Sequence, residues 1–218
     1  MKNSVFLLIT VIVLVVVISI ALSNALRNGT NEKEVSTMKN PKTLIVYYSR
    51  TDNTRVVAEL IQEKIGGDLI EIQTKTPRPQ NYKSEVRQNE QEQNENVLPE
   101  LKSAIDNFNE YDRIFIGFPT WNMALPQVIV TFLKNYDFSD KTVIPFNTNG
   151  GYGAGSAFSQ IKSIANEATI LEGLSLDGGR ENEGILLDIT GYKRVEVSKK
   201  IDIWLEKNLK IKGRYKNE

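Results

Sequence analysis

Residues 43–54 read TLIVYYSRTDNT, and this stretch decides the fold. Its apolar run, residues 44–46, is typical of a buried strand, and the residues that follow the stretch repeat apolar side chains at helical spacing. A strand therefore ends and a helix begins within it. The turn carries the hydroxyls of Ser49, Thr51 and Thr54 beside a helix N-terminus, where unpaired N–H groups and a partial positive charge favour a phosphate. The stretch predicts a phosphate-binding loop.

The composition excludes several kinds of chemistry. The chain has 218 residues, of which 40% are hydrophobic and 25% are charged, as in ordinary globular proteins. Lysine plus arginine and aspartate plus glutamate number 27 each, so no net charge favours a nucleic-acid partner. Cysteine and histidine are absent, which removes disulfides, thiolate nucleophiles, imidazole bases and the usual zinc and copper ligands. Chemistry must therefore come from a cofactor or from carboxylates and hydroxyls, and we expect no metal site.

The N-terminal region is predicted to lie outside the globular fold. Residues 5–22 are uncharged and almost all aliphatic. A helix of this length would span about 27 Å, which nearly crosses a bilayer core of roughly 30 Å. We predict residues 1–22 as a single-pass membrane anchor formed by an apolar helix, and residues 23–42 as a polar linker. Cleavage as a signal segment near residues 21–25 stays open.

The side of the membrane on which the domain lies is predicted from the flanking charges and from the form of the segment. Four basic residues lie between positions 27 and 42, whereas Lys2 alone precedes the apolar run, a balance that by itself favours a cytoplasmic domain. However, a short basic start followed by an apolar run resembles an export signal. We expect an extracytoplasmic domain at the cell membrane, with a cytoplasmic-facing domain and a secreted protein as alternatives.

From residue 43 onward, strand-like apolar runs alternate with amphipathic helical patterns, which predicts an α/β fold with a mostly parallel sheet. The predicted strands are residues 43–48, 68–73, 113–118, 141–146 and 169–174. The predicted helices are residues 54–64, 97–107, 126–135, 156–166 and 195–209. Trp204 lies on the apolar face of the last helix and is expected to be a core residue. Residues 213–218 are predicted to form a basic tail.

Two stretches lack an apolar period. Residues 74–96 contain two prolines and a run of Gln, Asn and Glu, which predicts a solvated excursion. Its acidic residues are expected to form a solvent-exposed (wet) face, with a docking patch for a partner as the alternative. They are Glu85, Glu90, Glu92 and Glu95, followed by Glu100. Residues 175–191 are predicted to be irregular, with a turn at 177–179 and a short strand or lid at 184–189.

Two further loops are expected beside the phosphate-binding loop, because ligands of an open doubly wound sheet bind at the carboxyl ends of its strands. Residues 119–126, after the third strand, present Trp121 on a polar, proline-bounded turn. Residues 147–155, after the fourth strand, carry four glycines around Tyr152. Glycines let the backbone approach a ring, and the two aromatic side chains can stack on its faces. The loops predict a ligand with a phosphate at one end and a planar ring at the other, which is the shape of flavin mononucleotide (FMN).

The three loops and their spacing resemble those of flavodoxins, and the resemblance covers nearly all of residues 43–209. Flavodoxins open with Thr/Ser-x-Thr/Ser-Gly-x-Thr around the flavin phosphate, and residues 49–54 match this pattern except at one position. Residues 117–121 and 147–155 are similar as well. The resemblance implies a five-stranded, doubly wound parallel sheet in the order 2-1-3-4-5 with helices on both faces. It also implies that residues 43–212 form an FMN-binding domain.

The resemblance assigns roles within the three loops. The hydroxyls of the phosphate-binding loop would hold the FMN phosphate with neighbouring amides, and Trp121 and Tyr152 would flank the isoalloxazine ring. The backbone of Thr120, Asn122 and Gly151 would meet the polar edges of the ring. The residues implied to bind FMN are Ser49, Arg50, Thr51, Asp52, Asn53, Thr54, Pro119, Thr120, Trp121, Asn122, Met123, Asn147, Thr148, Asn149, Gly150, Gly151, Tyr152 and Gly153.

Asp52 is the one departure in the phosphate-binding loop, since it stands where the family pattern has glycine. Aspartate can adopt a left-handed turn at some cost, but it brings a carboxylate near a phosphate dianion. We expect it either to point outward or to cap the helix at the amide of Thr54 or Arg55, with Arg50 and Arg55 offsetting its charge. The prediction is that Asp52 weakens flavin retention.

The sequence as a whole predicts an FMN-binding electron-transfer protein of flavodoxin type at the membrane. Its expected partner is a redox protein or a membrane electron donor, and the domain outside the membrane is expected to be monomeric. No residue is predicted to be a catalytic acid or base. Two alternatives stay open, an NAD(P)H-dependent quinone or flavin reductase on the same fold and a flavin-free adhesion or scaffold module.

Overall fold

The computed structural model describes residues 40–102, 104–180 and 183–210. Most of the predicted anchor and linker, and the predicted basic tail, lie outside these residues. Within the described part of the chain, no helix is both long enough and apolar enough to cross a membrane. The described residues from Pro41 onward belong to one compact unit.

A parallel sheet forms the centre of this unit, with the path β2-β1-β3-β4-β5, so the predicted order 2-1-3-4-5 is confirmed. Its strands are β1 (Thr43–Tyr47), β2 (Asp68–Glu71), β3 (Arg113–Pro119), β4 (Thr142–Asn149), β5 (Thr169–Ile170) and β6 (Leu174–Asp177). In the sheet register, Ile45 of β1 lies beside Leu69 of β2 and Phe115 of β3. Strands buried on both faces need continuous apolar runs, which is why β1 and β3 were recognisable from the sequence.

The predicted fifth strand is divided into β5 and β6, both of which pair with β4. Between them, the backbone of Glu172 is bonded to the last helix, α6 (Gly191–Leu209), instead of to another strand. The Glu172 carbonyl oxygen accepts hydrogen bonds from Trp204 Nε1 at 2.8 Å and from Asn208 Nδ2 at 3.3 Å, and its N–H donates to Asn208 Oδ1 at 3.1 Å. These bonds satisfy the backbone where the strand is interrupted.

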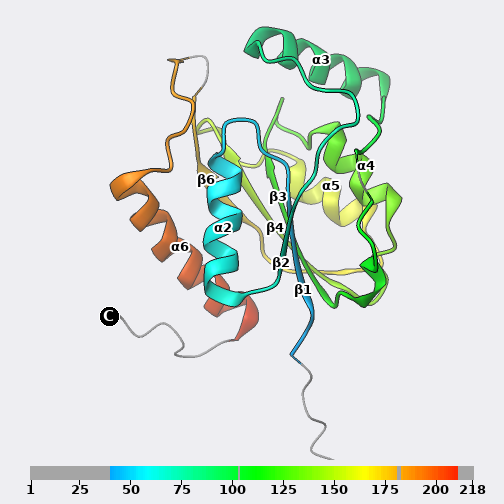
Figure 1. Cartoon of the computed structure of the whole chain (residues 1–218), viewed down its shortest axis with the longest axis vertical. Coiled ribbons are helices and arrows are strands. Elements are labelled where there is room, and N and C mark those ends of the chain that lie inside the picture. The colour runs from blue at the N-terminus through cyan, green and yellow to red at the C-terminus, as the bar shows by residue number, and fades with distance from the viewer. Residues whose placement is uncertain (1–39, 103, 181–182, 211–218) are drawn as a thin grey trace, which may run out of the picture. The chain divides into compact units, whose positions relative to one another are not determined.

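Helices cover both faces of the sheet, as predicted (Figure 1). On one face, α2 (Asn53–Ile65) and α6 pack on side chains such as Ile45. On the other, α4 (Gln127–Asn135) and α5 (Ala157–Ile164) pack on alternate side chains such as Leu44. Trp204 is 6% exposed and its ring meets that of Phe115 at a centroid distance of 5.8 Å, so its predicted place in the core is confirmed.

The prediction for residues 74–107 is wrong. The helix lies at α3 (Tyr82–Glu95), inside the expected excursion. The described residues of 97–107, which were predicted as a helix, are irregular and lead to a short 3-10 helix, η1 (Phe108–Glu110). Asn81 starts α3, since its side chain accepts a hydrogen bond from the Ser84 N–H at 3.2 Å. In Figure 1, α3 lies at the top of the view, and it contacts one helix layer through α4, where Gln127 Nε2 donates to the Glu92 carbonyl oxygen.

The predicted solvent exposure of the acidic residues in this stretch is wrong for two of them. Glu85 and Glu92 are 2% and 6% exposed, and both face partly buried arginine side chains. Glu90, Glu95 and Glu100 are exposed, as predicted.

Three further boundaries differ from the prediction near the C-terminus, one of them the start of α6 at Gly191 instead of residue 195. β6 occupies the start of the stretch expected to be irregular and runs into the expected turn at 177–179. Of the short strand or lid expected at 184–189, the strand is absent from the described residues there, where a single bridge joins Arg180 to Ile185, and the lid stays a prediction.

Candidate functional site

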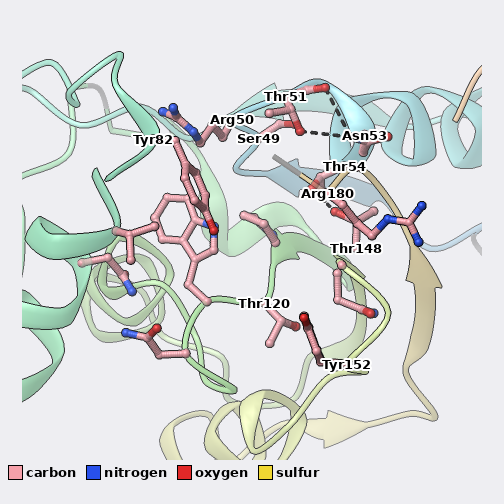
Figure 2. Close-up of a pocket in the computed structure, with 18 of the residues that line it drawn as sticks. Ser49, Arg50, Thr51, Asn53, Thr54, Tyr82, Thr120, Thr148, Tyr152 and Arg180 are labelled. Carbon is pink, nitrogen blue, oxygen red and sulfur yellow. Dashed lines mark hydrogen bonds between the residues drawn. The ribbon is translucent and has the colours of Figure 1, made fainter. Parts of the chain in front are cut away.

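A cavity of about 390 Å³ lies at the carboxyl ends of β1, β3 and β4, where the three predicted loops meet. Its volume lies in the range of small-molecule sites. Figure 2 shows the hydroxyl side chains of the phosphate-binding loop on one side of the cavity and Tyr152 on the opposite side. The lining residues are Ser49, Arg50, Thr51, Asn53, Thr54, Tyr82, Val86, Asn89, Pro119, Thr120, Trp121, Asn122, Met123, Thr148, Asn149, Gly150, Tyr152, Gly153, Gly179 and Arg180.

The phosphate-binding loop leads directly into α2. The Ser49 hydroxyl accepts a hydrogen bond from the Arg55 N–H at 3.4 Å, and the hydroxyls of Thr54 and Thr148 are 2.8 Å apart. Asp52 is the N-cap residue of α2, and its side chain makes no capping hydrogen bond. Because the Asp52 side chain does not cap the helix, Ser49 bonds the Arg55 N–H, and the N–H groups that precede it in the first turn suit an anion. This arrangement fits the phosphate of FMN.

Asp52 has the left-handed backbone conformation that the glycine pattern requires, with φ 64°. Its carboxylate accepts a hydrogen bond from Arg55 Nε at 3.0 Å and is about half exposed. This hydrogen bond and the attraction of the carboxylate raise the pKa of the Arg55 guanidinium. The outward orientation is therefore confirmed, and the alternative that Asp52 caps the helix is wrong.

Asn53 lines the cavity, but its carboxamide is bonded to a distant segment of backbone. Nδ2 donates to the Leu186 carbonyl oxygen at 2.6 Å, and Oδ1 accepts from the N–H groups of Asp188 and Ile189 at 2.9 and 3.1 Å. Asn53 itself is 2% exposed. Its side chain therefore ties the phosphate-binding loop to the segment that enters α6.

Arg50 connects the same loop to the segment before α3. Its guanidinium donates to the carbonyl oxygens of Pro79 and Gln80 at 3.1 and 2.9 Å and forms an ion pair with Glu85. The Tyr48 hydroxyl also donates to Glu85, at 3.3 Å. Burial raises the pKa of Tyr48 above its ordinary value.

The loop after β3 holds Trp121 through a tight turn. Trp121 and Ala124 exchange backbone hydrogen bonds of 3.2 and 2.9 Å, and Asn122 and Met123 between them both have positive φ. The Trp121 ring meets the Tyr48 ring edge-on at a centroid distance of 5.6 Å. The indole is therefore fixed in place beside the cavity.

The loop after β4 is shaped by Asn149. Its Oδ1 accepts hydrogen bonds from the N–H groups of Gly151 and Gly153, both at 2.9 Å. Tyr152 between them is 75% exposed at the mouth of the cavity. Gly155 has φ 55°, and a Cβ there would lie 2.2 Å from the Met123 carbonyl oxygen. The two aromatic loops thus touch at a point where only glycine fits.

Most of the predicted site residues come together around this cavity, and three do not line it. Asp52 points outward, Gly151 lies in the chain between the lining residues Gly150 and Tyr152, and Asn147 is fully buried with its Nδ2 bonded to Thr120 Oγ1. Asn147 thus positions Thr120. That the lining residues bind FMN stays a prediction.

Five lining residues were not predicted. Tyr82, Val86 and Asn89 belong to α3, and Gly179 and Arg180 follow β6. The N-cap residue Asn81 was the available sequence signal for α3. A cap residue alone does not predict a helix, and α3 has too few apolar residues to show an amphipathic pattern. For the loop after β6, the predicted turn at 177–179 was the available signal, but it was not assigned to the site because β6 was not separated from β5.

The sequence matches the flavodoxin family over residues 42–187. The chain belongs to the flavodoxin family. A curated flavodoxin from Synechocystis sp. is 25% identical over 127 residues, which cover 56% of this chain and 61% of that protein. The chain thus spans less than two thirds of that relative's length.

Solved structures of flavoproteins resemble this flavodoxin-family chain over more of their own length. A flavoprotein from Bacteroides eggerthii is 29% identical with a TM-score of 0.64, over 78% of this chain and 99% of that one. One from Bacteroides uniformis is also 29% identical, with a TM-score of 0.62, over 75% and 99%. A Lactobacillus acidophilus flavoprotein in complex with FMN is 27% identical with a TM-score of 0.56, over 63% and 94%.

Proposed function

We propose that this flavodoxin-family protein is an FMN-binding electron carrier that is tethered to a membrane by its N-terminal segment. The observation that carries the proposal is one cavity that joins a hydroxyl-rich helix N-terminus to two aromatic side chains, Trp121 and Tyr152. A phosphate suits the helix N-terminus, and a planar ring suits the aromatic side chains. FMN combines these two groups, and the similar Lactobacillus acidophilus flavoprotein forms a complex with it.

The residues that would hold FMN follow from this arrangement. The hydroxyls of Ser49, Thr51 and Thr54 and the first amides of α2 would bind the phosphate. Trp121 and Tyr152 would flank the ring. When bound, FMN supplies the redox chemistry, and the dipoles around its ring set the potential.

The charges of the cavity support electron transfer rather than acid-base catalysis by the protein. Among the described residues that line it, Arg50 and Arg180 are the charged ones, and no carboxylate or lysine is present. Arginine stays protonated and cannot exchange a proton at neutral pH. The reductase alternative has no observation of its own in its favour.

The tether rests on the apolar residues 5–22, and we place the domain on the extracytoplasmic side as a monomer. Its partner is a redox protein or a membrane electron donor. Tyr152 and Met123, which are 75% and 47% exposed at the cavity mouth, leave the site open to such a partner. Protease treatment of intact cells tests the placement. A digested domain supports it, a protected domain indicates the cytoplasmic side, and release into the medium indicates cleavage.

An absorption spectrum of the purified full-length protein tests the function. We expect flavin bands, and a dithionite titration that resolves two one-electron steps. A colourless protein that takes up no added FMN would refute the proposal. Rapid steady-state oxidation of NADPH with a quinone would instead favour the reductase.

A further inference from the structure

α3 is a polar helix whose place beside the cavity is maintained by buried charges. Arg78 contacts Glu85, with Nε and Oε1 3.6 Å apart, and forms an ion pair with Glu92. Arg50, from the phosphate-binding loop, forms an ion pair with the same Glu85. The Arg78 guanidinium also lies 5.9 Å from the centroid of the Trp121 ring. These contacts fix α3 against both the phosphate-binding loop and the loop after β3.

Asn89 lies on the face of α3 that carries these charges, four residues after Glu85 and three before Glu92. It is 1% exposed and lines the cavity. Its carbonyl oxygen, Oδ1, is buried and has no hydrogen-bond partner within the described chain. The carboxamides of Asn53 and Asn149, which also line the cavity, are bonded to backbone groups. Since buried acceptors are normally paired, the donor for Asn89 is missing from the protein itself.

We propose that Asn89 Oδ1 accepts a hydrogen bond from the flavin, so that α3 forms a third, ligand-selecting wall of the site beside the two aromatic loops. This inference rests on the proposed binding of FMN. FMN has two kinds of hydrogen-bond donor besides its phosphate, the ring N–H and the hydroxyls of the ribityl chain. Either one supplies what Oδ1 lacks, whereas a planar ligand without such a donor leaves the oxygen unpaired.

Flavin affinity of the full-length apoprotein tests this role, with quenching of flavin fluorescence as the readout. Asn89→Leu keeps the approximate size of the side chain and removes the acceptor. We expect its Kd for FMN to rise about tenfold, which corresponds to about 1.4 kcal/mol. Asn94→Leu is the matched control, since Asn94 is exposed on the same helix and does not line the cavity. Its Kd should stay within about twofold of that of the unchanged protein.

Lumiflavin, which keeps the ring N–H and lacks the ribityl hydroxyls, identifies the donor. If Asn89→Leu weakens lumiflavin binding by the same factor, the donor is on the ring. If it weakens FMN binding alone, the donor is a ribityl hydroxyl. Asn89→Ala, which adds no bulk in a helix, replaces Asn89→Leu if that variant does not fold.

The two proposals fail in different ways. An unchanged protein that binds no FMN would refute the proposed function. If the wild-type protein binds FMN, and the Asn89 variants bind it as tightly as Asn94→Leu does, the role of Asn89 is refuted and the proposed function is not. In that case a water molecule satisfies Oδ1.

Discussion

Asn53 is expected to act as a structural clamp, and Asn53→Ala measures its contribution. The carboxamide makes three hydrogen bonds to backbone groups of residues 186–189, at 2.6, 2.9 and 3.1 Å. Loss of the carboxamide leaves those backbone groups without their partner. Since Asn53 is only 2% exposed, water has little access to the atoms of its side chain. At about 1 kcal/mol for each bond, the free energy of unfolding should fall by about 2–4 kcal/mol. For a domain of this size, the Tm should fall by about 5–15 °C.

Urea unfolding of the apoprotein, followed by circular dichroism, is the appropriate assay because no flavin contributes to the stability. The urea midpoint should fall while the m-value stays the same. Asn94→Ala is the control, since Asn94 is exposed and its variant should change the unfolding free energy by less than about 0.5 kcal/mol. If Asn53→Ala unfolds at the same midpoint as Asn94→Ala, the clamp does not stabilise the fold and the reasoning is wrong.

Three further predictions concern single residues. Asp52→Gly should bind FMN several-fold more tightly in a fluorescence titration, because it removes a carboxylate near the phosphate site and a left-handed strain of about 1 kcal/mol; an unchanged Kd would contradict this. Gly155→Ala should weaken FMN binding about tenfold or more, because its Cβ would lie 2.2 Å from the Met123 carbonyl oxygen and would displace the loop after β3. Full affinity would show that this loop can move without loss of binding. Burial and the hydrogen bond to Asp68 raise the pKa of Tyr111 from 10 to about 12. The unfolded phenol therefore ionises first, so the contribution of Tyr111 to stability is complete below pH 10 and is lost as the pH rises toward 12. Urea unfolding across this range should show a smaller loss for Tyr111→Phe, and equal losses in both proteins would refute the assignment.

The strands were predictable because their signal is local. β1 and β3 are continuous apolar runs, and the order of the sheet came from the resemblance of the loops to those of flavodoxins. α3 was missed for the opposite reason. Its buried residues are Glu85, Asn89 and Glu92, so no apolar period marks it. Its stability depends on arginines outside the helix, and the sequence does not show which charges meet in space.

For the site, the sequence predicted the loops but not the contacts of their side chains. Hydroxyls and glycines after β1, β3 and β4 mark three loops, and the structure brings these loops to one cavity. The partners of individual side chains could not be predicted. Asn53 is bonded to Leu186, 133 residues away, and Arg50 to Gln80, 30 residues away. Residue type indicates that a side chain can bind a ligand, whereas its actual partner is fixed only by the fold.

The interruption between β5 and β6 also affects how this domain can meet another chain. The described edge strands are short, with two residues in β5 and four in each of β6 and β2. At the break, α6 side chains already occupy the backbone N–H and carbonyl groups of Glu172. Neither edge therefore offers a long row of free backbone groups for strand addition by a second molecule. The redox partner that we propose would instead have to recognise side chains, so its specificity could change through surface substitutions that leave the sheet intact.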